Sequence, residues 1–97
     1  MQRHTAHSIG DLLTDYLRES GLEKQLLERQ LVDKWPEVMG PAVARLTRSV
    51  ELNNGVLMVR ISSAALKAQL FECRKEVISK LNASVGAQIV SDVRFLG

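Results

Sequence analysis

Hydrophobic positions recur at two different spacings, and the spacing changes several times along the chain. From about residue 9 to about residue 46 the apolar side chains recur every three or four residues, as on one face of a helix. The next segments, TRSVEL and VLMVRI, follow a two-residue period, which is typical of strands. Helical spacing returns in SSAALKAQLFECRKEVISKLNASVG, and QIVSDVRFL alternates again. The pattern predicts the order helix, helix, strand, strand, helix, strand.

The first predicted helix has clear signals at both ends. It spans about residues 9 to 20, where the segment SIGDLLTDYLRES carries apolar side chains at helical spacing. Ser8 is a suitable N-cap, and Gly21 tolerates the left-handed conformation that ends a helix. Residues 1 to 7 show no periodicity and are expected to form a flexible lead-in. One domain is therefore expected over residues 8 to 97.

The segment KWPEVMGPAV contains the only tryptophan of the chain and both of its prolines. We expect the second helix, LEKQLLERQLVDKW, to end near Trp35, because Pro36 disfavours helical geometry in the residue before it. Pro41 suits the first position of a short helical turn. Two interpretations of Trp35 are open: a core residue whose N–H reaches a nearby acceptor, or a surface platform for base stacking. The core interpretation is favoured, since only Lys34 beside it is basic.

The two alternating segments are predicted to form an antiparallel hairpin. Asn54 and Gly55 lie between them, and both tolerate the positive φ angles that a tight primed turn requires. If the alternation is regular, Arg48 shares a face with Val50, and Thr47 lies on the opposite face.

The last long helical segment is predicted to be one helix of about 20 residues. Ser62 or Ser63 would cap its start, and it would stop between Asn82 and Gly86. This helix would cross over the sheet so that the final strand rejoins the hairpin. The fold class that follows is α+β, with two layers and a small, mainly antiparallel sheet.

Composition excludes several classes of protein. The chain has 97 residues, of which 45% are hydrophobic and 25% charged, as expected for one globular domain. No apolar run approaches the roughly 20 residues that span a bilayer, and the N-terminus lacks the apolar block of a secretory signal. The single cysteine, Cys73, cannot form an internal disulfide. We therefore expect a cytoplasmic protein without membrane contact.

Charge is distributed unevenly along the chain. Residues 1 to 37 carry five Lys or Arg and seven Asp or Glu, whereas residues 38 to 97 carry eight and four. The basic C-terminal part favours polyanions, although it falls short of the dense Lys and Arg clusters of a dedicated nucleic-acid binder.

No constellation of residues predicts an active site. His4 and His7 lie in the lead-in without a third metal ligand in view. Cys73 lies on an apolar helical stripe without a histidine to activate it. The glycines follow no phosphate-loop spacing. The sequence therefore predicts a protein that is not an enzyme, with no cofactor, metal or small-molecule substrate.

Two basic residues interrupt the apolar face of the long predicted helix. At 100° per residue, Lys67 and Arg74 lie one above the other beside the apolar stripe. One interpretation is that their stems pack while their charged ends reach solvent. The other is that, with Lys75 and Arg60, they contact phosphate or an acidic partner.

The succession SIGDLLTDYL, KWPEVMGPAVARLTRSVEL, NGVLMVRISSAALKAQL, EVISKLNASVG and VSDVRFL resembles the DciA-like family, long catalogued as a domain of unknown function. The resemblance covers the chain from about residue 8 to residue 96. Its most specific pieces are the segment from Trp35 to Gly40, the turn from Asn54 to Leu57, the helix with Leu66 and Leu70, and Leu81 and Asn82 before Gly86.

The resemblance implies a KH-like α+β module. For the best-studied branch it also implies a role in loading or recruiting the replicative DNA helicase. Members of that branch look longer, with a basic extension after the module. This chain looks closest to the short, single-domain members.

Three functional hypotheses follow. In the first, the domain is a non-enzymatic adaptor that binds the replicative helicase and, weakly, DNA through Arg60, Lys67, Arg74, Lys75, Arg45 and Arg48. The second is an RNA-binding module in translation or ribosome function, because KH-like folds serve there too. The third is a homodimer without nucleic acid, in which a second copy covers the apolar hairpin face around Val56 and Met58.

Overall fold

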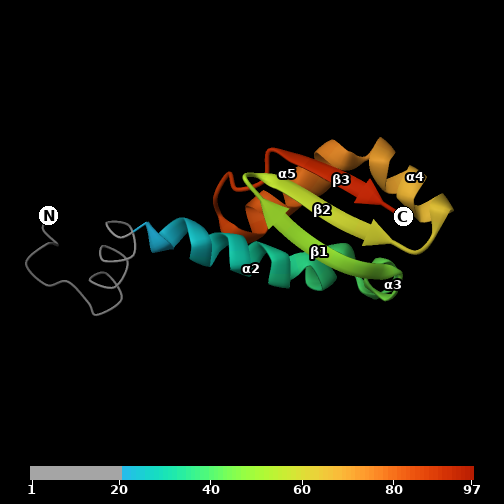
Figure 1. Ribbon diagram of the computed structural model, residues 1–97, viewed down its shortest axis with the longest axis horizontal. Coiled ribbons are helices and arrows are strands. Elements are labelled where there is room, and N and C mark those ends of the chain that lie inside the picture. The colour runs from blue at the N-terminus through green and yellow to red at the C-terminus, as the bar shows by residue number, and fades with distance from the viewer. Residues whose placement is uncertain (1–20) are drawn as a thin grey trace, which may run out of the picture.

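Three strands form one sheet, and the described helices pack against one of its faces (Figure 1). The computed structural model describes residues 21 to 97, so the predicted lead-in and first helix lie outside the described residues. The elements are α2 (Leu22–Met39), α3 (Pro41–Arg45), β1 (Thr47–Asn53), β2 (Val56–Ile61), α4 (Ala64–Glu72), α5 (Arg74–Val85) and β3 (Asp92–Leu96). None of these helices is long and apolar enough to cross a bilayer. The predicted α+β fold is confirmed.

The core lies between the sheet and the helices. On the central strand, Leu57, Val59 and Ile61 are buried, while the alternate residues of that strand are not. Facing them are buried side chains from α2, α4 and α5: Leu31, Trp35, Leu70, Val77 and Leu81. Because β2 buries only one of its two faces, the domain has two layers.

The strand order is β1-β2-β3. β1 and β2 pair antiparallel, as the predicted hairpin requires, whereas β3 pairs parallel to β2. The helices α4 and α5 connect the two parallel strands, since a parallel pair cannot be joined by a tight turn. The expectation of a mainly antiparallel sheet therefore holds for the hairpin and not for the last strand.

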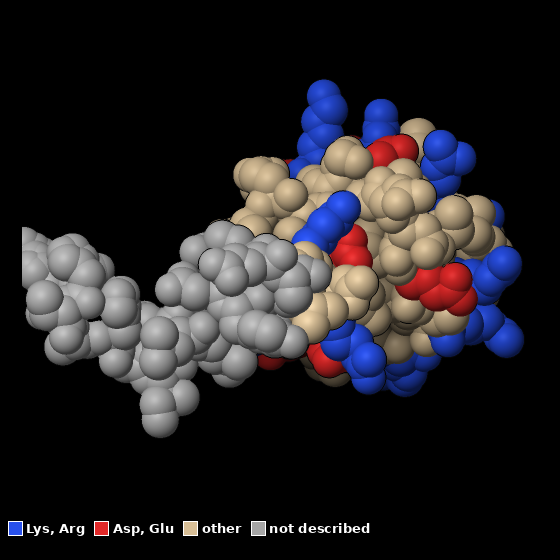
Figure 2. Space-filling model, turned by 60° about the vertical axis from the view of Figure 1, so that its left-hand side comes forward, with Lys and Arg blue, Asp and Glu red and all other residues tan. Residues whose placement is uncertain are grey.

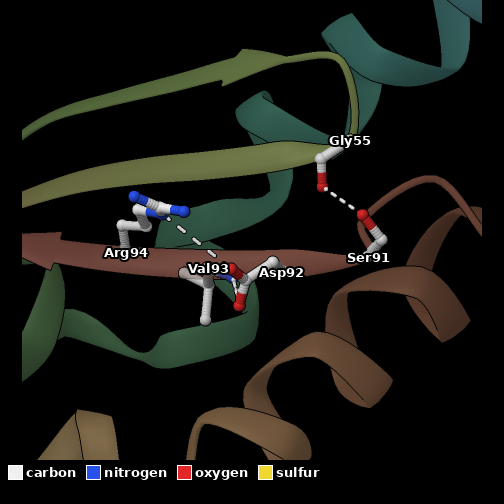
Figure 3. Close-up of polar contacts among 5 residues, drawn as sticks. All are labelled: Gly55, Ser91, Asp92, Val93 and Arg94. Atoms are coloured by element: carbon white, nitrogen blue, oxygen red, sulfur yellow. Dashed lines mark hydrogen bonds and ion pairs between the residues drawn. The ribbon is translucent and has the colours of Figure 1, made fainter.

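The hairpin turn matches the sequence prediction and also anchors the last strand. Asn54 and Gly55 have φ angles of 52° and 83°, so both residues adopt the left-handed conformation. The carbonyl oxygen of Gly55 accepts hydrogen bonds from the backbone N–H of Ser91 at 2.8 Å and from its hydroxyl at 3.2 Å (Figure 3). The tip of the hairpin thus fixes the start of β3.

Trp35 is a core residue, as favoured from the sequence, with 1% of its surface exposed. Its indole N–H donates to the hydroxyl oxygen of Thr47 at 3.0 Å. That hydroxyl donates in turn to the carbonyl oxygen of Val43 at 2.8 Å. The chain of two hydrogen bonds ties α2 to α3 and to the first residue of β1.

The second helix does not end at Trp35, which corrects the prediction. α2 continues through Pro36 to Met39, and the N–H of Gly40 donates to the carbonyl oxygen of Pro36 at 2.9 Å. A proline inside a helix loses one hydrogen bond and crowds the preceding turn. Burial of the Trp35 side chain offsets this cost, because a large aromatic contributes more to the core than one backbone hydrogen bond contributes to the helix. The chain bends instead at Gly40, whose φ is 92°.

The single long helix predicted after Ser63 is two helices. Ser63 caps the first, since its hydroxyl accepts from the N–H of Leu66 at 3.2 Å. At Cys73 the chain departs from helical geometry, with φ −108° and ψ 26°, and α5 begins at the next residue. One straight helix of about 20 residues would be about 30 Å long, while strands of five or six residues reach only about 17–20 Å. The break allows both helices to cover the sheet.

A β-bulge at Arg48 changes which side chains share a face. Thr47 pairs with Ile61 and Ser49 with Arg60, so Arg48 is the extra residue on β1. Thr47 therefore lies on the core side, where it meets the Trp35 indole, and the predicted assignment of Thr47 and Arg48 to faces was wrong. The alternation of side chains in the sequence does not reveal a bulge, since the position of the bulge is set by the contact between Thr47 and Trp35.

Buried Asn82 holds the connection between α5 and β3. Its side-chain oxygen accepts from the N–H groups of Ile89 at 3.0 Å and Val90 at 2.8 Å. Its amide donates to the carbonyl oxygen of Val90 at 3.0 Å and to the side chain of Gln88 at 3.2 Å. The Asn82 side chain thereby satisfies backbone polar groups of this loop that have no partner in a strand or helix.

Substituting Thr47 with Val should destabilise the domain, because it leaves the buried Trp35 N–H without an acceptor. An unsatisfied buried donor costs about 1–3 kcal/mol. Thr47→Ser keeps the hydroxyl and should lose clearly less stability. Urea denaturation of both variants measures the difference, and equal losses would contradict a role for the hydroxyl.

Substituting Gly55 with Ala should cost more stability than the same change at Gly86. Both glycines have positive φ, where an L-residue pays about 1–2 kcal/mol. A Cβ at Gly55 would also lie 3.0 Å from the Ser91 hydroxyl, whereas a Cβ at Gly86 would meet nothing within 4 Å. The comparison of unfolding free energies isolates the close approach of β3, and an equal cost at both positions would refute it.

Candidate functional site

Three of the six predicted basic residues converge on one open cavity of about 560 Å³ at the end of the sheet. Three different elements supply these side chains: β1, β2 and α4. The lining residues are Arg48, Arg60, Ile61, Ser62, Ala64, Lys67 and Gly97. We call this the basic cavity.

Each cation reaches the basic cavity for a local structural reason. Arg48 is the extra residue of the β-bulge. Arg60 is the exposed neighbour of buried Ile61, one residue before the end of β2. Lys67 lies one turn into α4, whose start is fixed by the Ser63 cap. The same contacts that shape the fold therefore bring the charges together.

The segment between β2 and α4 closes one side of the cavity. The backbone N–H of Ser62 donates to the carbonyl oxygen of Leu46 at 2.8 Å, and its hydroxyl donates to the same oxygen at 3.1 Å. Across from it, a guanidinium N–H of Arg60 donates to the backbone oxygen of Gly97 at 3.3 Å. The Lys67 ammonium is 3.4 Å from the position that a Cβ on Gly97 would occupy. Gly97 thus lies close to two of the cations, and its backbone oxygen accepts a hydrogen bond from one of them, Arg60.

No Asp or Glu side chain lines the basic cavity. No acidic side chain in the lining neutralises these three like charges, so an anionic group that enters the cavity is attracted by all three. Phosphate suits such a site, because a guanidinium presents parallel N–H donors to its oxygens and an ammonium adds a point charge. The chemistry of the cavity is therefore anion binding.

A second, more apolar hollow of about 330 Å³ adjoins the basic cavity and shares Ala64 and Lys67 with it. Its other lining residues are Ala68, Phe71, Glu72 and Phe95. Phe71 is 55% exposed, and the Arg74 guanidinium lies 4.2 Å from its ring centroid. Arg74 also donates to the carbonyl oxygen of Phe71 at 2.9 Å.

The remaining predicted site residues do not line the basic cavity. Arg74 does not continue the helix of Lys67, because the break at Cys73 places the two residues on different helices. Lys75 and Arg45 are exposed and line neither hollow. The predicted stacking of Lys67 above Arg74 along one helix was therefore wrong.

Sequence reasoning did not single out Phe71 as a candidate site residue, because Phe71 and Ile78 both read as apolar positions of one helix. Ile78 does pack against the core, but Phe71 does not. Its exposure follows from its position just before the helix break, which the sequence pattern did not reveal.

The residues considered from the sequence for metal or nucleophile chemistry are Cys73, His4 and His7. Residues 21 to 97 contain no group of three or more His, Cys, Asp or Glu side chains that could hold a metal. The thiol of Cys73 is half-buried and contacts the carbonyl oxygen of Gln69 at 3.5 Å. His4 and His7 lie outside the described residues.

Basic side chains do not form one dense patch on the face seen in Figure 2. Lys and Arg project at several points around the outline, with Asp and Glu between them. The formal net charge of +2 agrees with this mixture. Attraction for a polyanion should therefore be local to the basic cavity and not spread over the surface.

Lys67→Met should weaken binding of pyrophosphate, used as a small probe of the basic cavity. The change keeps the apolar stem and removes one partly exposed charge, a loss of about 0.5–1 kcal/mol or a two- to fivefold rise in Kd. Lys75→Met removes the same charge outside the cavity and should leave the Kd unchanged. Amide shifts in an NMR titration report both values, and equal effects of the two substitutions would contradict the site.

Comparison with known proteins adds independent information. The model of a family described as "Dna[CI] antecedent, DciA" matches residues 8–95. A UPF0232 protein of Mycobacterium leprae (strain TN) is 29% identical over 89 residues, which cover 92% of this chain and 47% of that protein. A UPF0232 protein of Mycobacterium ulcerans is 28% identical, with 92% and 48% covered.

A third relative, from Mycolicibacterium smegmatis, bears the name "UPF0232 protein in recF-gyrB intergenic region" and is 27% identical, with 92% and 46% covered. This chain thus spans about half the length of these curated relatives. The family match extends over most of the chain, including the part before residue 21. The chain belongs to the DciA family.

Proposed function

We propose that this domain is an adaptor in the loading or recruitment of the replicative DNA helicase, which it binds while contacting DNA weakly. Membership of the DciA family supports the helicase part of the proposal. The DNA part is carried by one observation, the convergence of Arg48, Arg60 and Lys67 on a cavity that no Asp or Glu side chain lines.

Three cations suit weak and sequence-independent contact with DNA. Each phosphate that a basic side chain neutralises releases condensed counterions, and this release dominates nonspecific affinity. Dedicated binders make about six to ten such contacts, so three imply a low affinity that falls further with salt. An adaptor that hands DNA to another protein benefits from contact that is easily broken.

The adjoining hollow suits a contact with a nucleic-acid base in addition to the phosphate contacts of the basic cavity. Exposed aromatic side chains bind nucleic acid through the faces of unpaired bases, and an arginine above the ring adds a cation–π contact. Phe71 and Arg74 have this arrangement beside the basic cavity. An RNA strand has the same phosphates and bases, so RNA binding is the alternative that a parallel titration distinguishes.

The triple variant Arg48→Ala, Arg60→Ala and Lys67→Ala should lose most of the salt dependence of DNA binding. Removing three phosphate contacts lowers the slope of log K against log salt by about 2 for single strands and about 2.7 for duplex. The matched control replaces Lys24, Arg29 and Lys80, three exposed cations on α2 and α5, with Ala. Fluorescence anisotropy with DNA and RNA oligonucleotides at several salt concentrations measures both slopes. A control that loses as much as the triple variant would refute the site.

Capture of the purified replicative helicase tests the protein partner. Immobilised domain should retain the helicase in the presence of nuclease, because the contact is between proteins. The cavity variant should retain it as well. Helicase that is not retained, or is lost after nuclease treatment, would contradict the adaptor role.

A further inference from the structure

One face of the sheet carries no helix among the described elements (Figure 1). Val93 on β3 and the buried residues of β2 point to the helices, so the alternate positions point away from them. We call this side the open face. Its residues are Ser49, Glu51 and Asn53 on β1, Val56, Met58 and Arg60 on β2, and Asp92, Arg94 and Leu96 on β3.

The register arranges the open face in rows across the three strands. The middle row is Glu51, Met58 and Arg94, so an acid and a base flank an apolar side chain. Both charged residues are exposed, and Met58 is half-buried. The row thus has opposite charges at its two ends and a thioether at its centre.

The neighbouring row also has polar residues on either side of an apolar one, but only one of the two is charged. Asn53 and Asp92 flank Val56. The side-chain amide of Asn53 can donate a hydrogen bond to the carboxylate of Asp92. Within one molecule β2 lies between these two side chains, so the bond can form only between two molecules.

We propose that a second copy of this chain packs on the open face, related to the first by a two-fold axis that runs along β2. Such a rotation exchanges the outer strands, so β1 of each copy faces β3 of the other. Glu51 then meets Arg94 of the other copy, and this contact occurs twice. Met58 meets its own equivalent on the axis, and Asn53 meets Asp92.

Charge selects this orientation over the alternative. A two-fold axis across the strands would place Glu51 on Glu51 and Arg94 on Arg94, and like charges brought together are repelled. An isologous contact requires a self-complementary surface. The middle row has this property only when the axis runs along the central strand.

The ion pair within each copy does not prevent the contact. Arg94 lies 3.9 Å from Asp92, and the two side chains are 64% and 49% exposed (Figure 3). Exposed pairs of this kind contribute little, so Arg94 can exchange partners at small cost.

The third row limits the strength of the association. Arg60 would approach Arg60 of the other copy, although its guanidinium is held toward Gly97 at the end of the sheet. The face is also small. Three strands about 4.8 Å apart and about 17–20 Å long present about 250–300 Å². Standard interfaces bury about 800 Å² on each partner. We therefore expect a weak dimer that forms only at high protein concentration.

Sedimentation equilibrium of the full chain over a range of concentrations tests the proposal. The wild-type chain should change from monomer to dimer. Glu51→Lys and Arg94→Glu should each weaken association at least tenfold, because each creates two repulsive contacts. The double variant exchanges the charges and should return to within about threefold of wild type. Glu76→Lys, an exposed charge change on α5, is the control and should have no effect.

Thermal unfolding by circular dichroism shows that each single variant is folded before its mass is interpreted. Met58→Lys gives a second route, since two ammonium groups would meet on the axis and abolish the dimer. A wild-type chain that stays monomeric at about 1 mM overturns the proposal. The proposal is also overturned if the single variants dimerise as strongly as the wild type, or if the double variant does not regain dimerisation.

Discussion

The fold depends on a polar requirement inside an apolar core: the indole N–H of Trp35 must find an acceptor. The hydroxyl oxygen of Thr47 accepts from this N–H at 3.0 Å, and the same hydroxyl donates a hydrogen bond to the carbonyl oxygen of Val43. For Thr47 to face inward while Ser49 faces outward, the strand must contain one extra residue between them. That residue is Arg48, and the bulge is how it comes to line the basic cavity. A hydrogen bond in the core thus helps to place a charge at the surface.

Sequence reasoning predicted the features that depend on neighbouring residues. The Asn54 and Gly55 turn, the Ser63 cap, the short helix after Pro41 and the helix end at Gly86 all follow from local backbone preference. It failed where tertiary contacts override that preference. α2 passes through Pro36 because Trp35 is buried, and the last helical segment breaks at Cys73 because the sheet beneath it is short.

The sequence predicted the candidate site only in part, because tertiary contacts decide which basic residues come together. The basic residues could be named from the sequence, but their convergence depends on the bulge, the end of β2 and the start of α4 meeting in space. Arg48, Arg60 and Lys67 meet there, while Arg45 and Lys75 do not. The basic cavity lies at the end of the sheet and shares Arg60 with the open face. A two-fold axis along β2 places the same end of the two sheets side by side. A pair of domains would therefore present both basic cavities at one end.

Hydrogen exchange of the Trp35 indole proton, followed by NMR, tests most directly whether the core is built on this contact. The account predicts that the indole proton exchanges as slowly as the amides of β2, because only global unfolding exposes both. An indole proton that exchanges at the rate of a tryptophan open to water would contradict it.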